Sequence, residues 1–158
     1  MTLKLKTLLG RIIDKGVTDA NKMGAAMACA AVDTIKRFFS YTNISPEDFD
    51  YIITGDLGIE GHSIAREMLN LEKLCLKNNF TDCGILIYDA KKQDTHSGGS
   101  GCGCIASVFS GHFVKLLKEK KVNNILAIAT GALLNPNSVF QKKSIPAIAH
   151  AIHFTTEE

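Results

Sequence analysis

Apolar positions along this chain fall into two kinds of stretch, and the two kinds alternate. Short continuous apolar runs such as Phe49–Thr54 end in glycine-containing turns, which is typical of buried strands. Longer stretches such as Glu60–Leu76 repeat apolar residues every three or four positions, which is typical of amphipathic helices. The pattern predicts strands at Leu3–Ile13, Phe49–Thr54, Cys83–Tyr88, Ile125–Ala129 and Ile145–Phe154. It predicts helices at Met23–Phe39, Glu60–Leu76 and Ile105–Lys120, and loops at 89–103 and 135–143.

This alternation of strands and helices predicts an α/β fold. Because the strands are continuously apolar, the pattern indicates a five-stranded sheet covered by helices on both faces. Met23–Phe39 is apolar nearly all round until Asp33, so we expect a helix that is buried on most sides. A length of 158 residues fits one domain, and we expect residues 1–158 to form it.

The composition narrows the class of protein. With 46% hydrophobic and 22% charged residues the chain can fill a core, which excludes wholesale disorder. Eighteen basic against sixteen acidic residues give a net charge of +2, which excludes a nucleic-acid binder that works by charge alone. Residues 1–15 lack the apolar run of a secretory signal, and the uncharged stretches 95–114 and 122–141 are too polar to span a bilayer. We therefore expect a protein that is soluble by itself and reaches a membrane only through a partner.

The five cysteines are an odd number, and most lie in predicted helices or strands. This favours free thiols in a cytosol-like compartment over a disulfide framework. Cys102 and Cys104 are two residues apart, but two thiolates are half of a zinc site and no second pair has ligand spacing. We expect no metal site. A catalytic thiol at Cys102, near a predicted helix N-terminus, is an alternative to the favoured role of both residues in packing.

The strongest local feature is the glycine-rich segment His96–Gly101, between a predicted strand and a predicted helix. Glycines let the backbone approach a ligand, and the helix start beyond them offers N–H groups to a carboxylate or phosphate. The segment lacks a P-loop or dinucleotide fingerprint, and its spacing fits an ordinary loop equally well. Asp56 ends a predicted strand, where ligands gather in α/β sheets, and Asp89 flanks the loop; both also fit ordinary turn residues. The candidate ligand-binding residues are His96, Ser97, Gly98, Gly99, Ser100, Asp56 and Asp89.

Six distinctive motifs span most of the chain. They are GRIIDKGVTDANKMGAAMA (10–28), FDYIITGDLGIEG (49–61), TDCGILIYD (81–89), QDTHSGGSGCGC (93–104), ATGALL (129–134) and SIPAIAHAI (144–152). In content and order these motifs resemble the C-terminal half of the stage V sporulation protein AD family. That family is similar to the thiolases, whose fold pairs two α/β halves, each with a five-stranded mixed sheet. The resemblance implies a thiolase-like half-domain, without the N-terminal half in which thiolases carry their nucleophilic cysteine.

Residue by residue, the resemblance implies a ligand cleft without the condensing chemistry of thiolases. His96 falls on the thiolase active-site histidine, because His96–Gly101 is similar to the thiolase H-P-L-G-x-S-G loop. Ala129 stands where thiolases carry a second cysteine, and Gly55-Asp56 stands where ketoacyl synthases carry a histidine. Nucleophilic attack and proton transfer both need positioned partners. We therefore expect no catalytic residue and no enzymatic activity. The alternative is a residual acyltransferase that acts on a thioester through His96 and a cysteine.

The resemblance also implies a function in sporulation and germination. The family is taken to bind dipicolinic acid, free or as its calcium chelate, and to serve its uptake and release with membrane-embedded proteins of the same operon. We expect this chain to act likewise, in the cytoplasm or forespore at the periphery of the spore inner membrane. We expect no cofactor apart from calcium in the chelate, which Asp56 or Asp89 would favour.

The resemblance further implies a protein partner, because each thiolase half buries a large surface against the other. We expect a homodimer, or pairing with an N-terminal thiolase-like half, and no nucleic acid partner. The apolar segment Met23–Ala31 is the first candidate for the pairing surface. A subunit that only docks onto another protein is therefore a further alternative to ligand binding.

Overall fold

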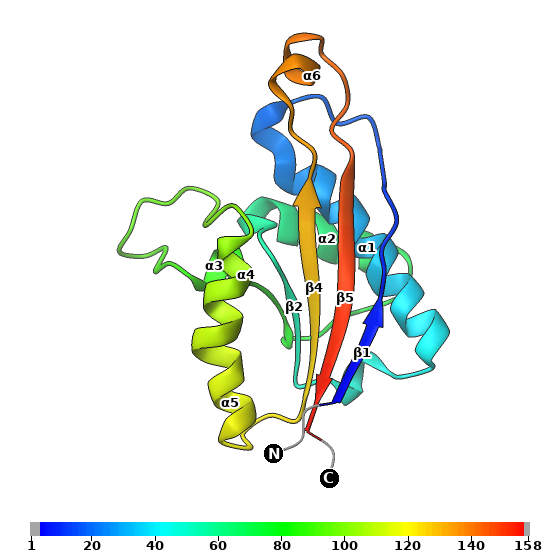
Figure 1. Ribbon diagram of the computed structural model, residues 1–158, viewed down its shortest axis with the longest axis vertical. Coiled ribbons are helices and arrows are strands. Elements are labelled where there is room, and N and C mark those ends of the chain that lie inside the picture. The colour runs from blue at the N-terminus through cyan, green and yellow to red at the C-terminus, as the bar shows by residue number, and fades with distance from the viewer. Residues whose placement is uncertain (1–3, 157–158) are drawn as a thin grey trace.

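The computed structural model describes residues 4–156, and these form one mixed β-sheet (Figure 1). The strands are β1 (Lys4–Leu8), β2 (Tyr51–Thr54), β3 (Phe80–Asp82), β4 (Asn124–Ala132) and β5 (Ala147–Thr155). Their order across the sheet is β1-β5-β4-β2-β3. β5 runs antiparallel to both of its neighbours, whereas β2 runs parallel to β3 and β4. The predicted five-stranded mixed sheet is confirmed.

Helices cover both faces of this sheet, as the continuous apolar strands predict (Figure 1). On one face lie α1 (Met23–Thr42) and α2 (Gly58–Leu71). On the other lie α4 (Gly103–Val108) and α5 (Val114–Lys118), joined by a π-helical segment at Phe109–Phe113. Each face has its own apolar cluster, one around α1 and α2, the other between β2, β4 and the α4–α5 segment. The shorter helices are α3 (Cys83–Leu86), α6 (Pro136–Phe140) and 3₁₀ turns at Ala20–Lys22 and Pro46–Asp48.

Small residues bring α1 close to the sheet and to α2. The first three buried positions of β5 are alanines, Ala147, Ala149 and Ala151. Thr34 of α1 donates its hydroxyl to the carbonyl oxygen of Ala149 at 2.8 Å. Where α1 meets α2, a Cβ on Gly61 would lie 2.7 Å from the carbonyl oxygen of Gly24. Only glycine therefore fits there without displacing backbone. This contact holds the N-terminal ends of the two helices together, beside the candidate site.

The predicted strand at Cys83–Tyr88 is wrong. The strand comes earlier, at β3, and the chain then turns directly into α3 because the Asp82 side chain caps that helix by accepting a hydrogen bond from Ile85 N. Cys83 is buried in the core, but Leu86 and Ile87 are exposed, so the second half of the apolar run lies outside it. A short apolar run fits a strand or a helix equally well, and here the cap decides.

Other element boundaries also differ from the prediction. Of the predicted strand Leu3–Ile13, β1 covers five residues; Leu3 lies outside the described residues, and Ile13 forms only an isolated bridge to Ala147. The predicted helix Glu60–Leu76 ends at Leu71. The predicted loop at 135–143 contains α6, whose first turn is capped by the Asn135 side chain.

The assignment of Met23–Ala31 as a pairing surface is also wrong for this chain. Most of its apolar side chains are buried within the chain, in the cluster that α1 forms with α2, β4 and β5. The large apolar side chains that remain exposed lie elsewhere, and several belong to the hairpin between β4 and β5.

Candidate functional site

A cavity of about 430 Å³ opens where the N-terminal ends of α1 and α2 meet the glycine-rich loop. Three chain segments form its walls: the start of α1, the connection from β2 into α2, and the loop residues 97–100. The cavity thus lies beyond the carboxyl end of β2, the edge of an α/β sheet at which ligands commonly bind. The lining residues are Asn21, Lys22, Met23, Gly24, Ala25, Met27, Asp56, Leu57, Gly58, Glu60, Gly61, Ile64, Ser97, Gly98, Gly99 and Ser100.

The fold gathers most of the predicted ligand-binding residues at this cavity, but not all of them. Asp56 and the segment Ser97–Ser100 line it. His96 does not: its side chain is 91% exposed, and its Nδ1 lies 3.7 Å from a carboxylate oxygen of Asp94 in the solvent. Asp89 also lies outside the cavity, where it accepts a hydrogen bond from Lys91 N and pairs with Lys92. A direct ligand contact by His96 or Asp89 stays a prediction that the cavity geometry does not favour.

Asp56 ties the loop to the sheet. Its Oδ2 accepts a hydrogen bond from Gly101 N at 2.7 Å, and its Oδ1 accepts one from the Thr130 hydroxyl at 2.8 Å. Its own N–H donates to the same hydroxyl oxygen at 3.2 Å. One carboxylate thus connects the end of β2, the end of β4 and the far end of the glycine-rich loop.

Asp82 is a site-organising residue that the sequence reasoning missed. Its side chain is fully buried and accepts four hydrogen bonds, from the Thr54 hydroxyl and from the backbone N–H groups of Leu57, Gly58 and Ile85. Burial raises the pKa of this carboxyl, while the hydrogen bonds oppose that shift. The missed signal was an aspartate at the carboxyl end of a strand, and the misplaced strand at Cys83–Tyr88 concealed it.

The glycine-rich loop is clamped to the two helices that Asp82 positions. The Ser97 carbonyl oxygen accepts from Ile59 N at 2.7 Å and the Ser97 hydroxyl oxygen from Glu60 N at 3.3 Å, both at the start of α2. Gly99 N donates to the carbonyl oxygen of Gly84 in α3 at 2.7 Å. Gly98 has φ of 111°, and a Cβ there would meet the same carbonyl oxygen at 2.6 Å. Glycine at this position is therefore a steric requirement.

The charges at the cavity are few and of both signs. Lys22 stands at the N-cap of α1, and its ammonium lies a loose 3.8 Å from Asp19. The positive dipole end of this long helix opens on the same side. Glu60 and Asp56 supply carboxylates. The arrangement suits a small molecule that carries negative charge and can share a cation with a carboxylate.

Two of the cysteines, Cys83 and Cys104, are buried, whereas Cys75 and Cys102 are exposed. All five are free. Burial raises the pKa of the Cys83 thiol to about 12 and also raises the pKa of Cys104. Buried, protonated thiols are poor nucleophiles. Within residues 4–156, no group of three or more histidine, cysteine or acidic side chains is placed to hold a metal ion.

A mixed α/β sheet with a cavity at its strand ends defines an α/β protein with a candidate ligand-binding site. Residues 2–155 match the stage V sporulation protein AD (SpoVAD) family, and the chain belongs to that family. It is 44% identical over 146 residues to stage V sporulation protein AD of Bacillus subtilis (strain 168). The alignment covers 92% of this chain and 43% of that protein, so the chain spans less than half the length of this curated relative.

Solved structures with a similar fold are thiolase-like synthases. The chain aligns with 3-oxoacyl-[acyl-carrier-protein] synthase III from Aquifex aeolicus VF5 at 15% identity and a TM-score of 0.41, covering 98% of this chain and 53% of that one. It aligns with MvaS in complex with 3-hydroxy-3-methylglutaryl coenzyme A at 13% identity and a TM-score of 0.48. This alignment covers 98% of this chain and 40% of that one. At TM-scores below 0.5 this likeness is remote.

Proposed function

We propose that this chain is a non-enzymatic, dipicolinate-binding component of the machinery that moves dipicolinate into the forming spore and out of the germinating one. The cavity at the glycine-rich loop carries the proposal. Its volume of about 430 Å³ lies within the range of about 300–1,000 Å³ typical of small-molecule sites. Membership of the sporulation family supports the ligand class.

The lining of the cavity matches the chemistry of dipicolinate, a flat pyridine with two carboxylates. Glycine backbone at Gly24 and Gly61 and along Gly98–Gly99 lines part of the cavity, and the missing side chains let the helices and the loop that form its walls pack closely against one another. Lys22 and the start of α1 favour a carboxylate. Glu60 lies across the same cavity, and its carboxylate suits the calcium of a chelate.

The thioester chemistry of the alternative function finds little support in these residues. The raised pKa values of Cys83 and Cys104 oppose a thiolate nucleophile. The His96 side chain is 91% exposed, whereas Cys83 and Cys104 are buried; Cys102 is exposed. A thioester consumed at a rate that falls in a His96→Ala variant would favour the acyltransferase.

We also propose association with the spore inner membrane and with membrane-embedded partners. Among residues 4–156, no helix is long and apolar enough to cross a bilayer. Because the chain covers 43% of its curated relative, pairing with a second thiolase-like half or with a second copy belongs to this proposal.

Calorimetric titration of dipicolinate into the folded chain, with and without calcium and with benzoate as the control ligand, tests the binding proposal. We expect saturable heat for dipicolinate only. Lys22→Ala should weaken binding by about tenfold or more, since a charge-assisted contact is lost. Lys91→Ala removes the same charge outside the cavity and should bind normally. Glu60→Gln should weaken binding only when calcium is present. No saturable heat from the folded chain would overturn the assignment of the site to these residues.

A further inference from the structure

The hairpin between β4 and β5 projects beyond the rest of the sheet (Figure 1). It exposes several large apolar side chains. We define the hairpin tip as residues 133–146 together with Ile12, which lies against them. Leu133 is 68% exposed, Phe140 84% and Ile12 72%. Below them lies a groove of about 340 Å³ lined by Ile12, Gly131, Ala132, Leu133, Pro146, Ala147 and Ile148. Apolar exposure concentrated in this way marks an interaction surface.

The hairpin tip is a built structure and not a loose loop. Its short helix α6 starts with Pro136 behind an Asn135 cap and ends with Lys142 N and Lys143 N donating to carbonyl oxygens of the helix. Its base is fastened to the segment after β1: Ser144 donates its hydroxyl to Asp14 at 2.6 Å, and Ile145 N donates to the Val17 carbonyl oxygen at 2.8 Å. Phe140 is therefore held out in solvent by ordered backbone.

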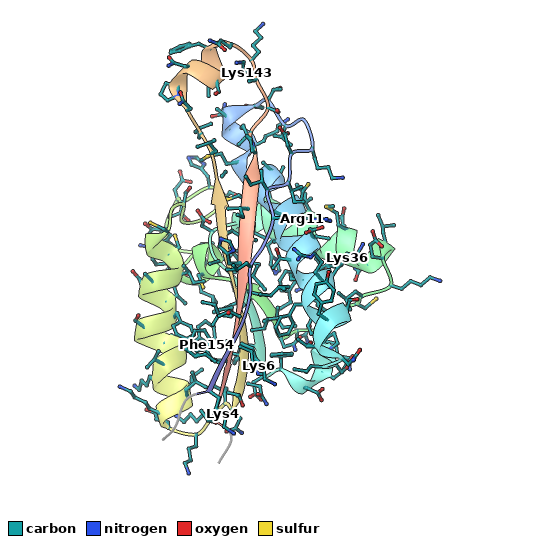
Figure 2. All side chains as sticks on the ribbon, turned by 45° about the vertical axis from the view of Figure 1, so that its right-hand side comes forward. Lys4, Lys6, Arg11, Lys36, Lys143 and Phe154 are labelled. Atoms are coloured by element: carbon teal, nitrogen blue, oxygen red, sulfur yellow. The ribbon has the colours of Figure 1, made fainter. Side chains whose placement is uncertain are left out.

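The charges at the hairpin tip have one sign. Residues 133–146 contain two lysines, Lys142 and Lys143, and no acidic residue. Lys15 adds a third cation from the neighbouring segment, where the one carboxylate, Asp14, already accepts hydrogen bonds from Ser144 and Gly16. None of these three lysines forms an ion pair with another residue of the described range 4–156. Lys143 stands at the far end of the molecule in Figure 2.

We propose that the hairpin tip binds directly to an anionic lipid bilayer. Phe140, Leu133 and Leu134 would enter the boundary between headgroups and acyl chains, and the lysines would meet lipid phosphates at the level of the headgroups. Apolar side chains bordered by cations are the pattern of interfacial membrane binding. Lysine side chains bury their methylene stems while their ammonium groups stay in water.

The same charges argue against a protein as the occupant. Lysine is depleted at protein–protein interfaces, where charged residues are excluded from the core of the contact. Here Lys142 and Lys143 directly follow Phe140 and Gln141 in the chain. A partner that buries the aromatic ring must therefore also accommodate the two ammonium groups. The hairpin-tip proposal specifies a surface for the membrane association proposed above. Direct binding of lipid by this chain goes beyond the sequence-based expectation that any membrane contact needs a partner.

Vesicle co-sedimentation of the full 158-residue chain tests this surface. We expect binding to vesicles that contain phosphatidylglycerol, weaker binding to pure phosphatidylcholine vesicles, and a loss of binding as salt is raised. The double variant Leu133→Ser, Phe140→Ser should lose most of the binding. Leu71→Ser is the matched control, because Leu71 is 86% exposed at the end of α2 and outside the hairpin tip.

Charge reversal tests the contribution of the hairpin-tip lysines separately from that of the apolar side chains. Lys142→Glu with Lys143→Glu should weaken binding to anionic vesicles by about tenfold or more, since each surface lysine strengthens such binding about fivefold. Lys91→Glu with Lys92→Glu makes the same change of charge in another exposed loop and should have little effect. If both double lysine variants weaken binding equally, the contact is diffuse attraction and the proposed surface is wrong.

Two further outcomes would overturn the proposal. One is a folded wild-type chain that binds neither kind of vesicle. The other is light scattering that shows a dimer which the Leu133→Ser, Phe140→Ser variant abolishes, because the tip would then be covered by a second copy. Circular dichroism of each variant confirms that it is folded. None of these measurements uses dipicolinate. The vesicle experiments therefore test the hairpin tip even if the cavity does not bind dipicolinate, and the dipicolinate titration tests the cavity even if the hairpin tip does not bind lipid.

Discussion

A single buried carboxylate, that of Asp82, connects four parts of the chain. It joins the end of β3 to the end of β2 through Thr54, and it holds the first turns of α2 and α3 through their backbone N–H groups. Those two helices in turn hold the glycine-rich loop. The geometry of the cavity therefore depends on a side chain that does not line it.

Asp82→Asn is expected to lower the free energy of unfolding by about 2 kcal/mol, because an amide keeps one acceptor oxygen and turns a donor toward buried donors. Urea denaturation followed by circular dichroism measures the change. Asp89→Asn, in an exposed turn, should stay within about 0.5 kcal/mol of the wild type. Equal midpoints for wild type and Asp82→Asn would contradict the organising role.

Thiol reactivity should divide the cysteines by burial. Cys75 and Cys102 are exposed, whereas Cys83 is buried with a pKa of about 12. At pH 8 roughly one Cys83 thiol in ten thousand is ionised, so iodoacetamide should label Cys75 and Cys102 and spare Cys83 until the protein unfolds. Mass spectrometry of native and urea-treated samples measures the labelling. Rapid native labelling of Cys83 would show that the α3 region opens.

At the scale of elements, the contact between α1 and α2 sets the width of the cavity. The two helix starts approach through Gly24 and Gly61, and Gly24 also lies against the β2–α2 connection, since a Cβ on it would meet the Leu57 carbonyl oxygen at 2.5 Å. The opposing atoms are backbone, which cannot rotate away. The two helices can approach this closely only because neither Gly24 nor Gly61 has a Cβ atom.

Gly61→Ala should therefore destabilise the fold by about 1–3 kcal/mol, because the added carbon would force the helices apart. Gly103→Ala is the control: Gly103 begins α4, and a Cβ there meets nothing within 4 Å. That variant should be neutral or more stable by up to about 1 kcal/mol. Urea midpoints of the two variants give the comparison, and a neutral Gly61→Ala would mean that the helices can separate at no cost.

Some elements could be predicted from the sequence because one local signal sufficed. The alternation along β5 and the apolar length of α1 each indicate their element without reference to the rest of the fold. Cys83–Tyr88 could not be placed, because its apolar run fits either element and a side-chain cap chooses between them. The glycine-rich loop was placed at the site by its position between elements. The exposure of His96 was not predictable, because no local signal in the sequence separates a histidine that lines a cavity from one that faces solvent, and its positive φ of 48° is not signalled either.

At the scale of the whole molecule, the cavity and the hairpin tip lie toward the same end of the sheet. The cavity follows the carboxyl end of β2, the hairpin follows the carboxyl end of β4, and the Asp56–Thr130 hydrogen bond links the two ends. β1 begins and β5 ends at the opposite end (Figure 1). A chain held at a bilayer by its hairpin tip would therefore carry the cavity close to the lipid surface.

Dipicolinate should stabilise the whole chain, because a ligand that binds only the folded state raises the free energy of unfolding. At a concentration about 100-fold above Kd the gain is about 2.7 kcal/mol, which for a chain of this size corresponds to a rise in Tm of about 5–10 °C. Differential scanning calorimetry with dipicolinate and with benzoate measures the shift. An equal shift with both acids would indicate a general anion effect instead of a specific site.

The glycine-rich loop is held at Ser97, Gly99 and Gly101 by hydrogen bonds to the protein itself. A wall that is already ordered loses little conformational entropy when a ligand arrives, and no slow rearrangement has to precede the contact. The observed rate of association should therefore rise linearly with ligand concentration in a stopped-flow experiment, without the plateau that loop closure would impose. Differences in affinity among ligands would then appear as differences in residence time. If the chain has the proposed function, in which bound dipicolinate is released at germination, the dissociation rate constant is the quantity that the ordered loop would set.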